Sequence, residues 1–477
     1  MSLKQQTFSA VRWTTLAMVG RAGLGFLQVA ILARLLDPAD FGLMALVVAV
    51  IAFAQIFADM GVSNAIVHHQ QVSQEELSSL YWLNVVAGGG MMLLLMFTSP
   101  FIASYYDVPA LQPLLIVVSV SFLVVTLGQQ LRVVAEKELR FAQLARIELA
   151  AVTVGFAVAV TWAFVSPSVA ALIAGTMASA AAMTILSWCF LAQGWRPMMR
   201  LRLLEIRRFL GFGGYTMANN LVNTFNMQAD ILIGGRFLSA QALGVYSLPR
   251  DLSLRVAGMI NPIVTRVGLP VMAKAQHDRA FLKNVYLKTL RMTTSVNFPI
   301  YLAMAVFAPE VVVLVFGAQW ADAAPLLRVL ALWGLLRSAG NPVGSLIFAV
   351  GRADLAFKWN LALILVVPPA LWVGAQYGNQ GLALALILIS LILVVPSWYV
   401  LVRPLCGAGF AEYFRQLLIP LIVASIAVAV AYAASWPLVN PAARLSAGIG
   451  AGGLTYLVLS NWLNRPWIDA MRELLGK

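Results

Sequence analysis

Three observations predict an all-α, polytopic membrane protein with about 14 transmembrane helices. Hydrophobic residues make up 61% of the 477 residues and charged residues only 11%, whereas about 25% of an ordinary soluble domain is charged. Apolar stretches of about 20 residues, the length that crosses a bilayer as a helix, recur from end to end. A short motif also recurs after 202 residues. This composition excludes a soluble globular, disordered or collagen-like chain.

Fourteen apolar stretches bounded by polar residues, Pro or Gly are long enough to span a membrane. The spans are expected at residues 13–36, 41–60, 80–104, 113–131, 147–165, 169–192, 211–235, 244–265, 292–315, 326–350, 359–375, 382–402, 416–434 and 445–463. Because this number is even, both termini should lie on the same side of the membrane.

The distribution of Lys and Arg orients these spans. With the N-terminus inside, 24 of the 32 basic residues fall in inner loops and tails, four at outer helix ends and four within spans. Cytoplasmic loops accumulate Lys and Arg, so both termini are expected in the cytoplasm. The richest basic stretch, 195–210, alternates Arg with apolar residues and is expected to be an amphipathic helix on the inner leaflet. A simple topology signal is the alternative for this stretch.

An internal repeat divides the chain. Residues 31–36 (ILARLL), followed by Phe41-Gly42, align with residues 233–238 (IGGRFL), followed by Leu243-Gly244. A repeat of six spans keeps its orientation, which predicts two parallel six-helix repeats related by an axis along the membrane normal, as in transporters. Chance similarity of two apolar hairpins is the alternative. The expected parts are an N-lobe at 1–194, a linker at 195–210, a C-lobe at 211–403, and two further C-terminal helices with a tail at 404–477.

Four arginines fall inside expected spans: Arg21, Arg250, Arg255 and Arg337. A charge at bilayer depth costs about 2.5 to 3.5 kcal/mol on insertion scales. These side chains should therefore face a shared interior that is wet or holds an anion. The planar guanidinium suits phosphate or carboxylate oxygens.

The seventh span carries a polar stripe that is expected to line the same interior. Its residues recur at spacings of 4, 3 and 4, which places them on one helical face. Amides in this number could bind sugar hydroxyls, whereas helix-to-helix hydrogen bonding is the alternative. The stripe consists of Asn219, Asn223, Asn226 and Asp230, extended by Tyr215, and Gln28 is the repeat counterpart of Asp230.

Three aspartates lie in expected spans. Asp251 and Arg255 stand four residues apart and are expected to form an ion pair. Asp59 and Asp230 are candidates to bind H⁺ or Na⁺, or to pair with an arginine of the other half. The sequence has no phosphate-binding Gly-rich loop and no metal-spaced Cys or His set. No cofactor, catalytic residue, metal site or nucleic-acid partner is expected.

Four segments carry a family resemblance: residues 35–43 (LLDPADFGL), 57–61 (FADMG), 226–234 (NMQADILIG) and 243–246 (LGVY). Together they resemble the oligosaccharide flippases of the multidrug/oligosaccharidyl-lipid/polysaccharide exporter superfamily. The first segment is similar to the colanic-acid exporter branch. The likeness extends over the first twelve expected spans.

This resemblance implies a flippase of the bacterial inner membrane and not an enzyme. It would move an undecaprenyl-diphosphate-linked oligosaccharide, an exopolysaccharide or O-antigen-type repeat unit, from the inner to the outer leaflet by alternating access. Its partners would be membrane lipids and the polysaccharide polymerase and chain-length regulator of the same pathway. Two alternatives of the same superfamily are a lipid II flippase and a cation-coupled drug exporter. A membrane polysaccharide polymerase or glycosyltransferase is disfavoured because every expected outer loop is short.

Overall fold

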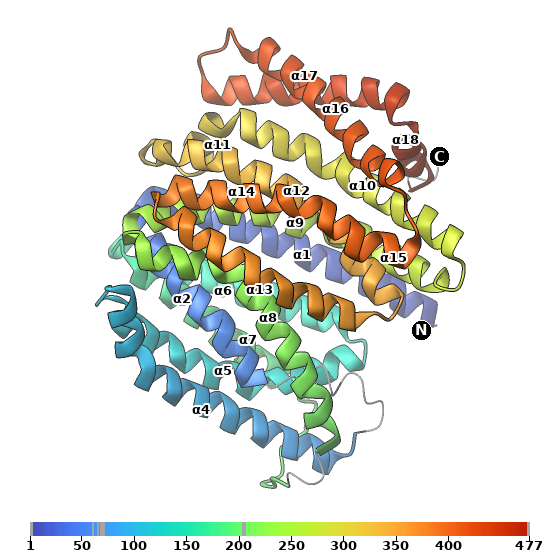
Figure 1. Ribbon diagram of the computed structural model, residues 1–477. Helices are drawn as coiled ribbons and strands as arrows, with labels where there is room; N and C mark the ends of the chain where they lie inside the picture. The colour runs from blue at the N-terminus through green and yellow to red at the C-terminus, as the bar shows by residue number, and fades with distance from the viewer. Residues whose placement is uncertain (1–2, 60–61, 64–65, 67–71, 203–206, 475–477) are drawn as a thin grey trace. The chain divides into compact units, whose positions relative to one another are not determined.

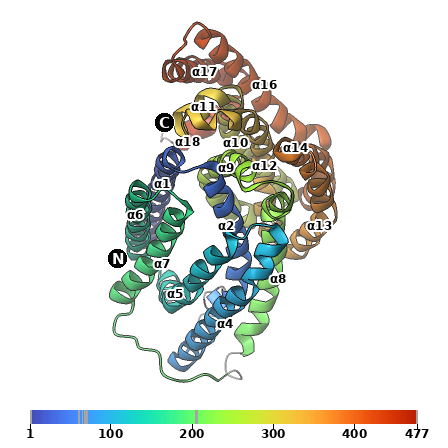
Figure 2. The same cartoon turned by 90° about the vertical axis from the view of Figure 1, so that its left-hand side faces the viewer.

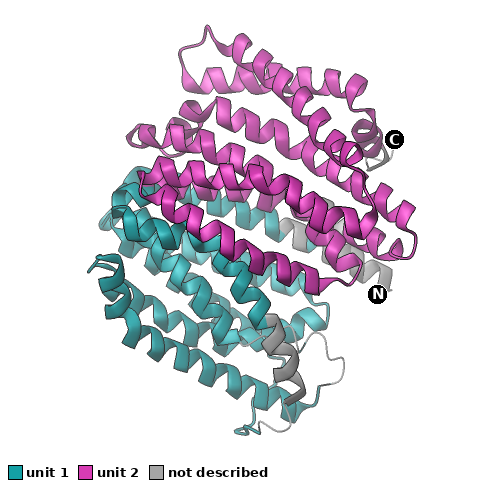
Figure 3. Cartoon of the chain, viewed as in Figure 1, with its two compact units in different colours: residues 1–244 teal, residues 245–477 magenta. Residues whose placement is uncertain are grey.

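The computed structural model describes residues 3–59, 62–63, 66, 72–202 and 207–474, and within them the chain consists of helices and connecting turns, with no β-strand (Figure 1). The expected all-α fold class is confirmed. The chain divides into two compact units, Met1–Gly244 and Val245–Lys477 (Figure 3).

Unit 1 is a bundle of long, mostly apolar helices. Its helices are α1 (Leu3–Leu35), α2 (Pro38–Asp59), α4 (Gln74–Tyr106), α5 (Leu111–Lys137), α6 (Phe141–Val165), α7 (Val169–Leu191), α8 (Arg207–Phe237) and the first residues of α9 (Ala240–Lys274). Neighbours in sequence pack together, α4 against α5 and α6 against α7, while α1 packs against α6 and α8 against α2 (Figure 2). α6 and α7 approach closely because Gly155 and Gly175 face each other, where a Cβ on either would meet backbone of the other helix.

Local signals set the ends of α4. The Ser73 side chain accepts a hydrogen bond from the backbone N–H of Glu76, and the Glu76 carboxylate accepts one from the backbone N–H of Ser73. This capping box satisfies two backbone donors at the helix start. Asp107, with φ of 56°, ends the helix in the left-handed conformation, and the next amide returns to the Ala103 carbonyl at 3.0 Å.

Unit 2 contains most of α9 and all later helices. They are α10 (Arg279–Val306), α11 (Ala308–Val315), the 3₁₀ turn η1 (Ala318–Ala323), α12 (Ala324–Ala349), α13 (Ala353–Ala375), α14 (Gly378–Ser397), the π-helical turn η2 (Trp398–Val402), α15 (Arg403–Cys406), α16 (Phe410–Ser435), α17 (Pro441–Leu463) and α18 (Arg465–Leu474). The last long helices, α16 and α17, form a hairpin that packs through α16 on α10. Glu310 of α11 binds Arg444 of α17 at 2.9 Å.

The ninth expected span, 292–315, corresponds to two helices joined at a bend. α10 begins earlier, at Arg279, and ends at Val306, and α11 then continues at an angle of 84° to it. Pro309 has no N–H to donate to the carbonyl of Ala305, four residues earlier, and its ring would clash there in a straight helix. The Arg328 side chain donates to that carbonyl instead, at 3.3 Å.

The linker also differs from expectation, because residues 195–202 form no helix. Their backbone is bound to the start of α4. Trp82 Nε1 donates to the Met198 carbonyl at 2.8 Å, and the Ser78 hydroxyl accepts from the Met198 N–H at 3.2 Å. Side-chain groups of α4 thus replace the hydrogen bonds that a helix would supply. Residues 203–206 lie outside the described part of the chain.

The helix boundaries agree with the 202-residue offset of the internal repeat. α1 ends at Leu35 and α8 at Phe237, and α2 begins at Pro38 and α9 at Ala240, so both junctions obey the same 202-residue offset. Helix pairings recur as well: α4·α5, α6·α7 and α5·α7 in unit 1 correspond to α10·α12, α13·α14 and α12·α14 in unit 2. The lobe boundaries expected from the sequence stay a prediction.

Ten of the described helices are long and apolar enough to cross a membrane, or eleven if the bent α10–α11 counts as one span. α8, α9 and α12 are outside this set. These three helices carry most of the polar and charged residues singled out in the sequence. Each of the fourteen expected spans overlaps a long helix, and the count of fourteen remains compatible with the structure.

Candidate functional site

Unit 1 encloses a polar cavity of about 700 Å³ between α1, α2, α5, α6 and α7. Its volume lies within the range that binds a small molecule or headgroup. The wall combines apolar side chains such as Phe122 and Phe141 with a set of amide, hydroxyl and charged groups. These polar groups belong to Gln55, Asp59, Ser63, Ser121, Thr126, Gln129, Arg132, Glu136 and Glu148.

Asp59, expected from the sequence as an ion-coupling candidate, lies on this wall at the end of α2. Its carboxylate accepts hydrogen bonds from the Gln129 amide of α5 and the Ser63 hydroxyl. Gln129 also donates to the Ser63 oxygen, at 2.9 Å. The three side chains therefore form one network that holds the carboxylate in place. Its role in ion coupling stays a prediction.

Arg21 lies beside the cavity on α1 and is bound to a carboxylate that lines it. Its Nη1 is 2.9 Å from Glu148 Oε2 of α6, and the two side chains are 54% and 34% exposed. An ion pair this open contributes little to stability, about 0 to 1 kcal/mol. Arg21 therefore does not lie in a dry interface. Its ion pair with Glu148 is weak enough for another anion to compete for the guanidinium.

Arg132, Glu136 and Glu148 line the cavity but were missed as site residues. The expected fourth span ended at residue 131, whereas α5 continues to Lys137 and carries Arg132 and Glu136 in its last turns. Arg132 makes no hydrogen bond or ion pair within the described residues, and its Nε is shielded from solvent. Arg132 and Glu136 could have been found only by extending the predicted helix beyond the end of its apolar stretch.

The polar stripe on α8 occupies several environments. Asn223 is exposed, Asn219 and Asn226 are half-buried, and Asp230 is buried at 3% exposure. One side of α8 packs on α2, where the rings of Phe225 and Phe53 meet edge to face with centroids 6.2 Å apart. The binding role of the stripe stays a prediction. Gln28 on α1 is half-buried, and the side chain of Tyr215 lies outside the described part.

In unit 2 the expected Asp251–Arg255 ion pair is wrong. Asp251 Oδ1 instead lies 3.4 Å from Nη1 of Arg250, whose side chain is only 6% exposed. A buried arginine needs a nearby acceptor more than an exposed one does. Arg255 is exposed and makes no ion pair in the described part of the chain. Arg337 of α12 is also exposed, and its guanidinium lies 5.4 Å from the Trp333 ring centre.

The expected site residues thus fall into two groups. Unit 1 holds Arg21, Gln28, Asp59 and the α8 stripe, and unit 2 holds Arg250, Arg255 and Arg337. In unit 1, Asp59 and Glu148, the partner of Arg21, line the same cavity. Among the described residues no group of three His, Cys, Asp or Glu side chains could hold a metal ion.

Comparison with known proteins shows the family to which this chain belongs. Residues 31–325 match the family described as polysaccharide biosynthesis protein. The chain is 34% identical to the lipopolysaccharide biosynthesis protein WzxC of Escherichia coli (strain K12), covering 91% of this chain and 88% of that protein. It is 30% identical to the teichuronic acid biosynthesis protein TuaB of Bacillus subtilis (strain 168), covering 96% of each. It is also 25% identical to the succinoglycan biosynthesis transport protein ExoT of Rhizobium meliloti (strain 1021), covering 94% and 91%.

Two solved structures share the fold. The lipid II flippase MurJ in an inward closed conformation matches with a TM-score of 0.77 at 15% identity, covering 96% of this chain and 100% of that one. An inward-facing multidrug transporter of the MATE family matches with a TM-score of 0.64 at 12% identity, covering 86% and 98%. At these identities the likeness concerns the fold.

Proposed function

The chain belongs to the polysaccharide biosynthesis protein family, and from that premise we propose that it is a flippase for lipid-linked oligosaccharides. Its cargo is an undecaprenyl-diphosphate-linked repeat unit of an exopolysaccharide or O-antigen-type polymer. The protein carries this cargo from the inner to the outer leaflet of the bacterial inner membrane. Both termini lie in the cytoplasm, as the Lys and Arg distribution favours.

The observation that carries this proposal is the polar cavity inside an otherwise apolar helical bundle. A lipid-linked oligosaccharide combines sugar hydroxyls with a diphosphate, and both lose their water in hydrocarbon. Amides, carboxylates and guanidinium groups on the cavity wall can replace that water by hydrogen bonds. The polyprenyl tail needs no such groups and stays in the lipid.

The site residues divide by chemistry. Arginines bind the diphosphate as a planar, permanently charged donor, whereas amides and a phenol bind sugar hydroxyls. Carboxylates couple transport to H⁺ or Na⁺. The diphosphate set is Arg21, Arg250, Arg255 and Arg337, the sugar set is Gln28, Tyr215, Asn219, Asn223 and Asn226, and the coupling set is Asp59 and Asp230.

Movement of the two repeats exposes the site first to one side of the membrane and then to the other. The matching helix boundaries of the two copies support such paired motion, since transporters built from repeats work by movement of one repeat against the other. A polysaccharide polymerase and a chain-length regulator then use the delivered repeat unit. No catalytic residue of this chain takes part.

The proposal is tested with purified protein in liposomes that contain a fluorescent undecaprenyl-diphosphate oligosaccharide. A membrane-impermeant quencher measures how fast the label reaches the outer leaflet. We expect Arg21→Gln to slow this movement by about tenfold to a hundredfold, the equivalent of one lost charge-assisted hydrogen bond. Arg255→Gln and Arg337→Gln should have similar effects, because these exposed side chains can be replaced without unfolding.

Arg146→Gln is the matched control, because Arg146 is exposed on α6, contacts the Trp13 ring and does not line the cavity. It should leave the rate unchanged. Labelled lipid II and a cationic dye are assayed in parallel. Transport of either one without the oligosaccharide lipid, or full activity of the three arginine variants, would contradict the proposal.

A further inference from the structure

The cavity of unit 1 contains one carboxylate, Glu148, that binds one arginine and shares the cavity wall with a second. Glu148 binds Arg21 at 2.9 Å, while Arg132 lines the same cavity and lies within electrostatic range of Glu148. Only one of the two arginines is therefore bound in this state. Arg132 makes no hydrogen bond or ion pair among the residues that the structure describes.

The unpaired state of Arg132 calls for an explanation. An arginine that is shielded from solvent, as Arg132 Nε is, is costly unless an anion or water accompanies it. The other carboxylates of the cavity do not serve it. Asp59 is held by Gln129 and Ser63, and Glu136, one turn further along α5, forms no ion pair with Arg132 within the described chain. Glu148 is the remaining carboxylate on the wall.

We propose that Glu148 exchanges partners when substrate binds, leaving Arg21 for Arg132. The inference rests on the proposed function, in which Arg21 binds the diphosphate. Arg132 is then a positioning residue: it touches no substrate atom but removes Glu148 from competition for the Arg21 guanidinium.

The energetics favour an exchange over a simple release. A diphosphate that takes Arg21 from Glu148 would leave a carboxylate without a partner in a partly desolvated cavity, and such a charge opposes binding. Capture of Glu148 by Arg132 offsets that cost. One ion pair exists before binding, and a second forms only after substrate has arrived, so the cavity senses occupancy of Arg21.

A double-mutant cycle tests the exchange, because coupled residues give non-additive effects. The full chain is placed in nanodiscs, and binding of undecaprenyl diphosphate without sugar is measured by titration. Arg132→Gln should weaken binding about fivefold or more, the lower end of ordinary coupling between sites. In a Glu148→Gln background the same substitution should have no effect, because no carboxylate is left to be captured. Glu148→Gln alone should bind at least as tightly as the natural chain.

Two further variants test whether the charge of Arg132 and the identity of the carboxylate matter. Arg132→Lys keeps the charge and should restore most of the affinity, whereas Glu136→Gln should not relieve the Arg132→Gln defect. Melting temperatures without ligand identify any variant that fails to fold, and Glu148→Gln then carries the test by itself.

The outcomes separate the two claims. Equal weakening by Arg132→Gln in both backgrounds means direct contact with substrate and overturns the exchange. No weakening in either background, or weaker binding by Glu148→Gln, also overturns it. The proposed function survives these results as long as the natural chain binds undecaprenyl diphosphate and Arg21→Gln does not. If the natural chain shows no such binding, both claims fall.

Discussion

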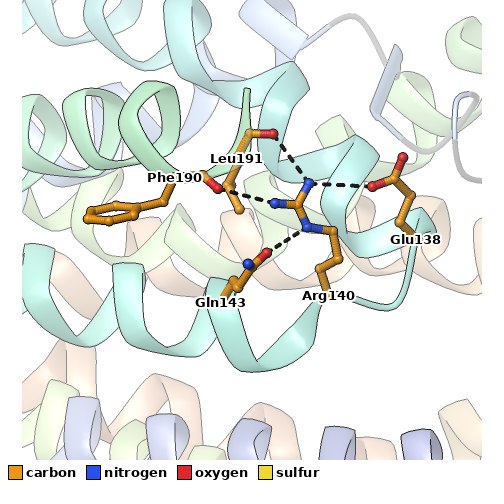
Figure 4. Close-up of polar contacts among 5 residues, drawn as sticks. All are labelled: Glu138, Arg140, Gln143, Phe190 and Leu191. Atoms are coloured by element: carbon orange, nitrogen blue, oxygen red, sulfur yellow. Dashed lines mark hydrogen bonds and ion pairs between the residues drawn. The ribbon is translucent and has the colours of Figure 1, made fainter. Parts of the chain in front are cut away.

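At the scale of single residues, Arg140 joins three parts of unit 1 (Figure 4). It lies in the turn between α5 and α6, where its Nε donates to Gln143 at 2.6 Å. Its two terminal nitrogens donate to the carbonyls of Phe190 and Leu191 at 3.1 and 3.3 Å. These carbonyls end α7, so the cation also meets the negative end of the helix dipole. Glu138 completes the cluster at 3.5 Å.

We predict that Arg140→Leu destabilises the protein by about 1 to 3 kcal/mol, because it leaves the end of α7 without its hydrogen-bond donors. Denaturant unfolding of the purified protein in detergent measures the change. Arg196→Leu is the matched control, since Arg196 is exposed at the same end of unit 1 and makes no hydrogen bond or ion pair among the described residues. Equal stability of the two variants would refute the capping role.

The interaction partners of single residues were the feature least predictable from the sequence. The span that contains Arg21 follows from a local run of apolar residues, but its partner Glu148 lies 127 positions away. Local spacing cannot reveal a contact between distant helices. Spacing misled outright at Asp251, where the i, i+4 rule selected Arg255 although the buried neighbour Arg250 has the greater need of a carboxylate. Charge-bearing positions could be predicted, whereas their partners depend on tertiary packing.

At the scale of elements, a side chain of α10 hydrogen-bonds to the backbone of α9. The Tyr301 hydroxyl of α10 donates to the Ser253 carbonyl at 2.6 Å and accepts from the Ala257 N–H at 3.1 Å. These are the two groups that a regular helix would join directly, so the hydroxyl is inserted between them. Such insertions bend helices. The two bonded groups span the turn from Ser253 to Ala257, which contains Arg255.

Tyr301→Phe should therefore cost about 1 to 3 kcal/mol, because two buried backbone groups lose their partner. It should also slow lipid movement, because the hydroxyl holds the turn of α9 that carries Arg255. Tyr286→Phe on the same helix is the matched control: its hydroxyl is buried and makes no hydrogen bond with the described residues, so its removal should be neutral or stabilising. Denaturant unfolding and the liposome assay are applied to both variants. Equal losses of stability and transport rate in the two variants would refute the role of the Tyr301 hydroxyl.

The repeat junction shows an element that the sequence did predict. Gly42 and Gly244 occupy the same position in the two copies, and in unit 1 they face each other. A Cβ on Gly42 would collide with the Ala240 carbonyl, and one on Gly244 with the Pro38 carbonyl. Backbone atoms cannot move aside as a flexible side chain can, so glycine is required in both copies. The bend within the ninth expected span was not predicted, because Pro309 acts on a carbonyl of the preceding turn.

At the scale of the whole molecule, the cargo's charge determines how the membrane potential acts on transport. A diphosphate carries two negative charges, and their outward movement across an inside-negative membrane is favourable by about 2.3 kcal/mol per charge per 100 mV. A flippase that only provides a polar path needs no ion gradient for outward delivery. The gradient becomes necessary if the return of the empty site depends on a bound H⁺ or Na⁺.

We predict that an inside-negative potential, set by potassium and valinomycin in liposomes without Na⁺ or pH gradients, drives the labelled lipid to the outer leaflet. Reversing the potential should reverse the distribution, because the charge on the diphosphate is fixed. A strict requirement for a Na⁺ or H⁺ gradient would contradict this prediction and point to the carboxylate that Gln129 and Ser63 hold. Asp59→Asn then tests the source of that requirement, since an amide at this position keeps the hydrogen-bonded network but binds neither ion.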